Sequence, residues 1–266
     1  MTSLRAVAIS RDRHTLILRI HLMPPSRRRL GPPSPTTGSP AAAVELLADG
    51  ASHTIQATIR TDHLHIMNTP RTCHLDLGCG AVPRNPYRRD QVVGVDIAPR
   101  GKVVGCEIVQ ANLTLAPIPF EDKRFDSVSA FDFLEHVPRV LPTPDGQGTR
   151  FPFIELMNEI SRVLRPGGLL YALTPCYPSG EAFQDPTHVN IITDRTHLYF
   201  TGPQPLGRMY GFSGYFEVCR VDWVVPRDAT DAAAKMTLHQ RWRRFNYRRK
   251  GQLSHLRWEL KCVKPA

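Results

Sequence analysis

One stretch of the sequence, residues 73–96, limits the folds open to this chain more than any other; it reads CHLDLGCGAVPRNPYRRDQVVGVD. Its first five residues, 73–77, are an apolar-rich run that predicts a short buried strand. Gly78 and Gly80 follow at once, where the backbone can turn tightly because neither residue has a Cβ atom. A strand that runs directly into a glycine turn predicts a ligand cradle.

The second half of the stretch adds a carboxylate to this cradle. A valine-rich run, 92–95, predicts a second strand, and it ends on Asp96, twenty residues after Asp76. In a sheet of parallel strands an acid at this place accepts hydrogen bonds from ribose hydroxyls, so the pattern predicts a pocket for a nucleotide-like ligand. Val82 and Pro83 stand where a dinucleotide-binding loop would start its helix. A pyrophosphate needs that helix N-terminus, so the sequence disfavours NAD.

Length, apolar runs and cysteines bound the class of protein. A chain of 266 residues can bury one substantial core, with at most a small appendage besides. No apolar run approaches the roughly 20 residues that span a bilayer, so we expect a cytoplasmic protein without a membrane span. The six cysteines form no C-x-x-C pair, and we interpret them as reduced core thiols.

The positive charge is concentrated at the two ends of the chain. The sequence has 34 Lys and Arg against 24 Asp and Glu, a net charge of +10. Residues 1–71 have nine basic and four acidic side chains, and residues 226–266 have eleven and three. Such ends can bind an acidic partner, but they are also common as ordinary solvated surface.

The first 68 residues do not read as the start of the folded domain. They are basic and rich in proline, and residues 24–40 in particular cannot build a packed element. We predict that residues 1–68 are a disordered extension, with one or two helical turns at 41–47, or that they precede a true start at Met67. The folded domain is predicted at 69–266.

The rest of the chain alternates predicted strands with a few helices. A helical spacing of apolar residues marks 153–164, a short helix is predicted at 202–211, and a basic insertion spans about 227–255. The further strands are predicted at 106–110, 125–131, 169–173, 216–225 and 256–262.

Two motifs in a fixed order point to a family. DLGCG at 76–80 and LRPGGLL at 164–170, about ninety residues apart, together resemble the marks of the class I S-adenosylmethionine-dependent methyltransferases, over residues 70–225. The resemblance implies an α/β, Rossmann-like, seven-stranded sheet, mostly parallel with one antiparallel edge strand and helices on both faces. It also implies S-adenosylmethionine as the cofactor, held by Asp76, Gly78, Gly80, Asp96, Asn112 and Phe133.

Two histidines are the candidate catalytic residues. His188 lies in a polar loop after the fifth predicted strand, close in sequence to Asp185 and Thr187, and is our first candidate for a general base. His136 follows the fourth strand, near the expected position of the transferable methyl, and is the second. We expect a small-molecule or glycan acceptor; neither the acceptor atom nor the oligomeric state is predicted.

Three alternatives stay open at this point. Asp132, Glu135 and His136 are similar to the metal-binding motif of small-RNA 2′-O-methyltransferases and ubiquinone-pathway O-methyltransferases, with His188 or His197 as a further ligand; we predict no metal. The basic and aromatic cluster at 241–250 can bind RNA, although we interpret it as a helix whose aromatic residues pack on the body. The chain can also be an adaptor that binds the cofactor without catalysis.

Overall fold

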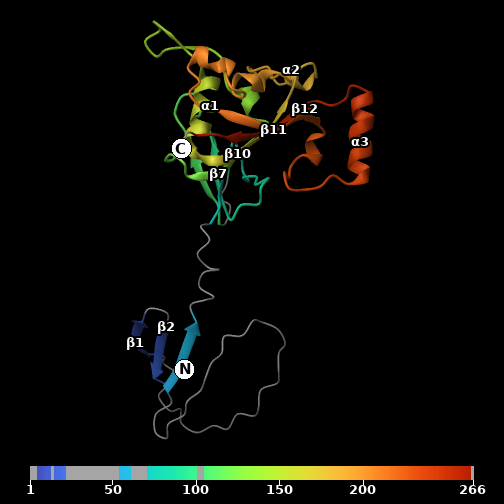
Figure 1. Cartoon of the computed structure of the whole chain (residues 1–266). Helices are drawn as coiled ribbons and strands as arrows, with labels where there is room; N and C mark the ends of the chain where they lie inside the picture. Colours follow the sequence, from blue (N-terminus) through green and yellow to red (C-terminus); the bar gives the residue numbers. More distant parts are fainter. Residues whose placement is uncertain (1–4, 13–14, 22–53, 61–70, 101–104, 265–266) are drawn as a thin grey trace. The chain divides into compact units, whose positions relative to one another are not determined.

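The computed structural model describes residues 5–12, 15–21, 54–60, 71–100 and 105–264, and it divides the chain into two units, 1–70 and 71–266. The first unit contains a three-stranded antiparallel sheet in the order β1-β2-β3, with β1 Arg5–Asp12, β2 Thr15–His21 and β3 Thr54–Arg60 (Figure 1). These strands lie within residues 1–68, for which the sequence predicts a disordered extension, and the predicted domain boundaries stay a prediction. The helical turns predicted at 41–47 lie outside the described residues.

The second unit is built on a seven-stranded sheet in the order β11-β12-β10-β7-β4-β5-β6. The five strands from β10 to β6 are parallel to one another, as the fold prediction requires. Their order places β4 near the centre, so the glycine turn after β4 opens at the middle of the carboxyl edge. The strands are β4 Cys73–Leu77, β5 Gln91–Asp96, β6 Glu107–Gln110, β7 Phe125–Phe131, β10 Leu164–Pro175, β11 Phe216–Val224 and β12 His255–Cys262.

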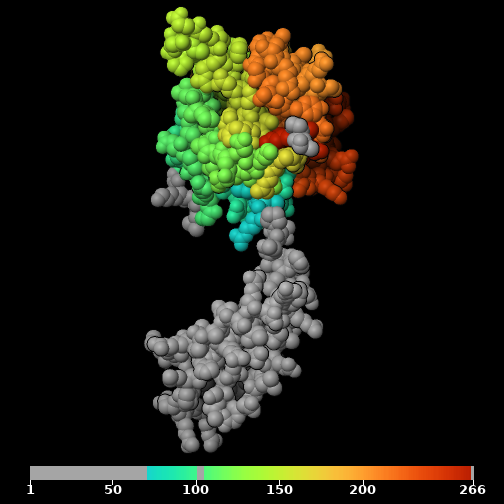
Figure 2. All heavy atoms as spheres, turned by 60° about the vertical axis from the view of Figure 1, so that its left-hand side comes forward, coloured from blue at the N-terminus to red at the C-terminus, as the bar shows by residue number. Residues whose placement is uncertain are grey.

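The antiparallel strand is not at the edge of the sheet, which corrects one detail of the prediction. β12 pairs antiparallel with β10 on one side and with β11 on the other, so β11 is the edge strand. β11 and β12 form an antiparallel hairpin whose connection contains the basic insertion, and the other edge of β12 pairs with β10. In the space-filling view the red atoms of the C-terminal segment accordingly lie among yellow and orange ones (Figure 2).

One face of the sheet is covered by helix α1, Pro152–Val163, close to the predicted 153–164. Met157 and Ile160 of α1 are fully buried in the main hydrophobic core, which also contains Leu75, Val128 and Trp258 from three strands. Each such side chain contributes roughly 1.5–3 kcal/mol when it leaves water. The LRPGG motif follows α1 and lies within β10, whose register shifts between Leu164 and Leu169, so the turn predicted there is a distorted strand start.

The opposite face is covered mainly by loops. Its apolar cluster contains Phe131, Tyr171, Leu173 and Val224, and Tyr87 from the loop between β4 and β5 packs against it. This loop contains no helix, in keeping with its prolines.

Helix α3, Leu238–Arg249, belongs to the basic insertion and contacts β11 on this second face. The remaining small elements are β8 Leu141–Pro142, β9 Thr149–Arg150, α2 Glu181–Gln184, η2 Leu134–His136, η3 Thr196–Tyr199, η4 Leu206–Tyr210, which lies within the short helix predicted at 202–211, and η5 Pro226–Asp228.

α3 contradicts our interpretation of the basic and aromatic cluster. Its aromatic residues Trp242 and Phe245 are 64% and 56% exposed instead of packed on the body.

Within the part of the chain that the structure describes, no helix is both long and apolar enough to cross a bilayer.

Candidate functional site

The glycine turn after β4 is held open by backbone hydrogen bonds to β5. Gly78 and Gly80 both have left-handed φ angles, +64° and +59°, which residues with a Cβ rarely adopt. The N–H of Gly78 donates to the carbonyl of Val95 at 2.8 Å. A Cβ on Gly78 would lie 2.5 Å from the ring of Phe133, whereas a Cβ on Gly80 would meet nothing within 4 Å. The turn is therefore packed on one side and open above Gly80.

Asp96 lies directly at this opening. One of its carboxylate oxygens accepts a hydrogen bond from the backbone N–H of Gly80 at 2.8 Å, and the other accepts one from Ala98 at 2.8 Å. Each carboxylate oxygen has a second lone pair, so Asp96 can still accept bonds from ligand hydroxyls. Asp76 and Asp96 end neighbouring strands on the same side of the molecule, as predicted.

Asp76 is placed differently from the other predicted cofactor residues. Its side chain is fully buried, and its two oxygens accept bonds from the N–H of Arg84 at 2.8 Å and the hydroxyl of Ser129 at 2.5 Å. Burial raises the pKa of this carboxyl to about 6. Asp76 therefore shapes the loop below the turn, and both oxygens already have a protein partner.

A directed chain of hydrogen bonds ends on Asp76. Because Ser129 donates to Asp76, its oxygen accepts from Nε2–H of His74 at 2.8 Å, and Nδ1 of His74 then accepts from Ser127 at 2.8 Å. Burial lowers the pKa of His74 to about 3, so the ring is neutral, as this pattern needs. This network could not be predicted from the sequence, since His74 occupies a position typical of a buried strand.

Asn112 follows β6 at the same edge. Its side-chain oxygen accepts the N–H of Thr114 at 3.1 Å, which folds the loop after β6. The amide nitrogen has no partner among the residues that the structure describes, and it can donate to a purine ring nitrogen. Asn112 is half-buried, so the amide is within reach of a ligand.

The two candidate bases come together although they are 52 positions apart in the sequence. The rings of His136 and His188 lie 4.8 Å apart, edge to face. The hydroxyl of Thr187 donates to Asp185 at 2.7 Å, so its oxygen accepts from Nδ1–H of His136 at 3.0 Å. Nδ1 of His188 lies 3.3 Å from the carbonyl of Ala182 and donates to it. Both rings thus keep the Nε2 lone pair free.

Glu135 lies beside the pair of His136 and His188. It is 1% exposed; Oε2 accepts from the hydroxyl of Thr174 at 2.9 Å, and Oε1 is buried and has no hydrogen-bond partner among the described residues. Burial raises the pKa of Glu135 to about 7. One potential ligand atom from each of Glu135, His136 and His188 lies within 4.8 Å of the other two.

The other residues of the metal alternative lie elsewhere. Asp132, with a φ of +49°, is 3.1 Å from Nε2 of His255, and His255 also contacts Glu181. His197 packs its ring near Trp258, 6.3 Å away. His255 was missed in the sequence because it begins a strand that reads as ordinary core.

A cavity of about 560 Å³ has Arg139 and Ile191 in its wall, three residues after His136 and His188 in the sequence, and neither histidine lines it. It is linked to the pair through the backbone, because the N–H groups of Val189 and Asn190 donate to the carbonyl of Glu135, and Arg139 bonds Asn190. Its lining contains two arginines and no acid. The lining residues are Arg139, Val140, Phe151, Phe153, Ile154, Ile191, Thr193, Arg195, Thr196, Tyr199, Phe200 and Tyr210.

Residues 75–172 match a family model described as a methyltransferase domain. No curated protein matches the chain. Similar solved structures include a methyltransferase from Archaeoglobus fulgidus described as dependent on S-adenosylmethionine (14% identity, 76% of this chain and 90% of that chain, TM-score 0.41). Another is a chain from a Haloferax volcanii complex of a methyltransferase activator with a candidate methyltransferase (14% identity, 77% of this chain and 89% of that chain, TM-score 0.45). A third is a geranyl diphosphate methyltransferase (16% identity, 73% of this chain and 79% of that chain, TM-score 0.41).

TM-scores below one half support no inference about chemistry. The chemistry of the site is therefore inferred from the match to the family model and from the geometry of the residues. The matched segment includes the open turn at Gly80 and the Asp96 carboxylate, together with Asn112 and Phe133; it ends before His188. The open space above Gly80 and the hydrogen-bonding groups around it suit the amino acid and ribose parts of S-adenosylmethionine. Over residues 75–172 the chain thus contains a segment that matches the methyltransferase-domain model, as the sequence motifs predict.

Proposed function

We propose that this methyltransferase modifies a small molecule or glycan, with His188 as the general base. The observation that supports this best is the free Nε2 of His188, whose ring lies 4.8 Å from that of His136, in the loop that leads to Ile191 in the cavity wall. η2 connects this pair to the turn, because the ring of Phe133 packs on Gly78 and its carbonyl accepts the N–H of His136 at 3.1 Å.

We infer that Gly80, Asp96, Asn112 and Phe133 contact the cofactor directly. Asp96 would accept from the ribose hydroxyls, the amide of Asn112 would donate to the adenine, and Phe133 would cover the turn. Asp76, which is fully buried, would act on the cofactor only through Arg84 and the shape of the loop. When bound, S-adenosylmethionine supplies an electrophilic methyl group on a sulfonium.

The residues of the chain then have two tasks. They hold the acceptor in line with that methyl and exclude water, and they take up the acceptor proton. In our proposal Nε2 of His188 would receive the proton of the acceptor O–H or N–H, while the acceptor atom would replace the sulfonium sulfur on the methyl carbon and S-adenosylhomocysteine would leave. His136, oriented by Thr187 and Asp185, positions the acceptor or replaces His188 as the proton acceptor.

The cavity limits the acceptor. Its volume of about 560 Å³ is in the range of pockets for small ligands. Aromatic rings dominate the wall, with Phe151 and Tyr210 5.3 Å apart and Tyr199 6.4 Å from Tyr210, and such rings bind aromatic or sugar faces. With arginines and no acid in the lining, we infer a neutral or negatively charged acceptor.

The experiment that tests this proposal is a methyl-transfer screen with labelled cofactor over small-molecule, saccharide and RNA pools. On the acceptor found, His188→Ala should lower turnover by roughly 10²–10⁴-fold while S-adenosylmethionine affinity, measured by calorimetry, stays unchanged. His239→Ala, an exposed histidine on α3, is the matched control. Normal turnover in His188→Ala would remove this residue from the mechanism, and cofactor binding with no turnover on any pool would support the adaptor alternative.

A metal-assisted reaction is the second candidate, and the unpartnered Oε1 of Glu135 favours it. Glu135, His136 and His188 offer one carboxylate and two imidazole ligands, which suit Zn²⁺ or Mn²⁺. The two schemes exclude each other, because a metal would occupy the lone pair that the base needs. Metal content of the purified protein and activity after chelator dialysis separate them: activity that survives chelation supports the base.

The RNA alternative depends on α3. RNA transfer would require methylation of the RNA pool and an RNA affinity that falls steeply with salt and with loss of the α3 arginines.

A further inference from the structure

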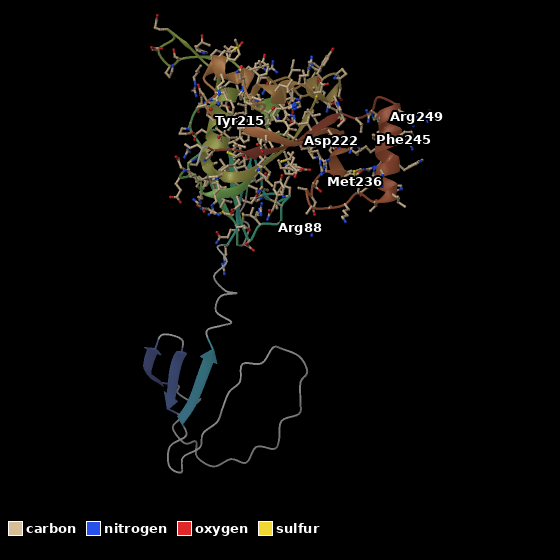
Figure 3. All side chains as sticks on the ribbon, viewed as in Figure 1. Arg88, Tyr215, Asp222, Met236, Phe245 and Arg249 are labelled. Carbon is tan, nitrogen blue, oxygen red and sulfur yellow. The ribbon has the colours of Figure 1, made fainter. Side chains whose placement is uncertain are left out.

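Helix α3 is attached to the domain by its charged residues. Arg243 donates to Asp228 from Nε at 2.9 Å, and Nη2 of Arg244 lies 2.8 Å from a carboxylate oxygen of Asp222 on β11. Figure 3 shows Asp222 on the side of α3 that faces the sheet, while Phe245 and Arg249 lie along the helix. Both arginines are thus paired with acids, and Asp222 is shared with Arg257 of β12, so most of the positive charge on the face turned to the body is balanced.

The opposite face of α3 exposes apolar side chains in a stripe. Leu238 is 82% exposed, and Trp242 and Phe245 follow at helical spacing, 64% and 56% exposed. A helix in a globular protein normally buries such a stripe, so this one is available to something outside the domain. The thermodynamic cost of leaving three large apolar side chains in water is recovered only when the stripe is covered.

The surroundings of the stripe are strongly basic. Arg241, Arg248 and Lys250 flank it, and the guanidinium of Arg249 lies 5.8 Å from the centre of the Phe245 ring. Residues 232–258 contain eight Lys and Arg and no acid; three of the eight, Arg243, Arg244 and Arg257, pair with Asp228 or Asp222, and the other five form no ion pair among the described residues. Charge complementarity therefore selects a negatively charged partner, and the stripe requires that this partner also accept apolar groups.

We propose that α3 lies on the surface of an anionic lipid bilayer, with Leu238, Trp242 and Phe245 in the interface and the flanking arginines against the headgroups. Helices that lie in this interface combine Leu, Trp and Phe on one face with Lys and Arg beside it. RNA would use the aromatic rings and the arginines, but an aliphatic side chain gives no stacking platform for a base, and Leu238 is the most exposed apolar residue of the stripe. The bilayer accounts for all three anchors and for the charge.

Vesicle binding by the full-length protein tests the proposal. Vesicles of phosphatidylcholine with an equal amount of phosphatidylglycerol should sediment the protein, and pure phosphatidylcholine vesicles should bind it far more weakly. Arg241→Gln with Arg248→Gln should weaken binding about 30-fold, at about fivefold for each charge near the surface. Raising the salt concentration should weaken it in the same direction.

The apolar anchors need their own variants. Trp242→Ala with Phe245→Ala should abolish vesicle binding, whereas Leu115→Ala with Met209→Ala, which removes equally exposed apolar side chains elsewhere, should not. Trp242 fluorescence should shift to the blue on vesicles, and Trp242→Phe should lose that shift and keep binding. All four positions are on the surface, and unchanged cofactor affinity in each variant verifies its fold.

The proposal is overturned if the protein does not bind the mixed vesicles, or if the Trp242 and Phe245 variant binds them as well as the unaltered protein. It is also overturned if single-stranded RNA, tested in the same buffer, binds in a way that these substitutions abolish while the vesicles do not bind.

Discussion

Substitution of Gly80 by alanine is the sharpest test of where the cofactor binds. Gly80 has a φ of +59°, and the space into which its Cβ would point is open. An alanine at this position would be strained in the left-handed backbone conformation, but its Cβ would contact no protein atom. Its methyl group would instead occupy the hollow beside Asp96, where we place the cofactor.

The stability part of this effect can be estimated and matched. An L residue in the left-handed region costs about 1–2 kcal/mol, which for a domain of this size lowers Tm by roughly 2–8 °C. Gly146 provides the control, because its φ is +71°, its Cβ would also meet nothing within 4 Å, and it lies in the hairpin between β8 and β9. Both variants should therefore lose a similar amount of stability.

Of these two variants, only Gly80→Ala should bind the cofactor more weakly. Calorimetric titration with S-adenosylmethionine should show an affinity at least about tenfold lower for Gly80→Ala, equivalent to about 1.4 kcal/mol, and an unchanged affinity for Gly146→Ala. Thermal unfolding of the same samples measures the backbone cost. If Gly80→Ala melts like Gly146→Ala and still binds the cofactor normally, the hollow above Gly80 is not the binding site.

Two further substitutions test the interior around the turn. Burial keeps the pKa of Asp76 at about 6 against 3.8 in the unfolded chain, so its proton is bound more tightly in the folded state. The contribution of this carboxyl to stability is present in full below the unfolded pKa and is lost as pH rises through about 6, by about 3 kcal/mol in all. Asp76→Asn should remove this part of the slope in urea unfolding between about pH 4 and pH 7, and an equal slope in both proteins would contradict the assignment. Gly94→Ala would place a Cβ 2.5 Å from the sulfur of Cys79 and 2.7 Å from Pro83, so it should lower the free energy of unfolding by about 1–3 kcal/mol. Gly180→Ala, which meets nothing, should melt normally.

The central strands could be predicted because their residues are apolar and continuous. The run 73–77 is buried at every position, as a strand with both faces covered requires. The place of β12 could not be predicted in the same way. Its alternation fits any strand of an antiparallel pair, and only the pairing with β10 and β11 decides that it lies inside the sheet.

α3 shows where pattern reasoning failed. The sequence of the helix mixes arginines and aromatic residues on every side, so composition alone does not decide which face turns inward. The deciding residues are outside the helix: Asp222 on β11 and Asp228 in η5 pair with Arg244 and Arg243 and fix the orientation. Two charge-assisted pairs, one of them with an almost fully buried acid, outweighed the tendency of Trp242 to pack inward.

The candidate site was predicted in part, for a reason that lies in the topology. Parallel strands bring their carboxyl ends to one edge, so the residues after β4, β5, β6, β7 and β10 had to meet. This argument found Gly80, Asp96 and the pair of His136 and His188. It does not determine how each side chain bonds, so it missed that Asp76 faces the interior and that Glu135 lies beneath the histidines.

The absence of a helix between β4 and β5 explains why a chain of polar side chains is buried beneath the glycine turn. In a doubly wound sheet a helix would cover this face with apolar side chains, but the prolines of residues 83–86 prevent it. The loop that replaces the helix has backbone N–H groups that need acceptors, and Asp76 supplies one to Arg84. A buried acid needs donors in turn, and Ser129 with His74 behind it provides them in a single direction. Asp76, near the end of β4, therefore supports the loop beneath the glycine turn, and Asp96 presents its carboxylate at the open side of the turn.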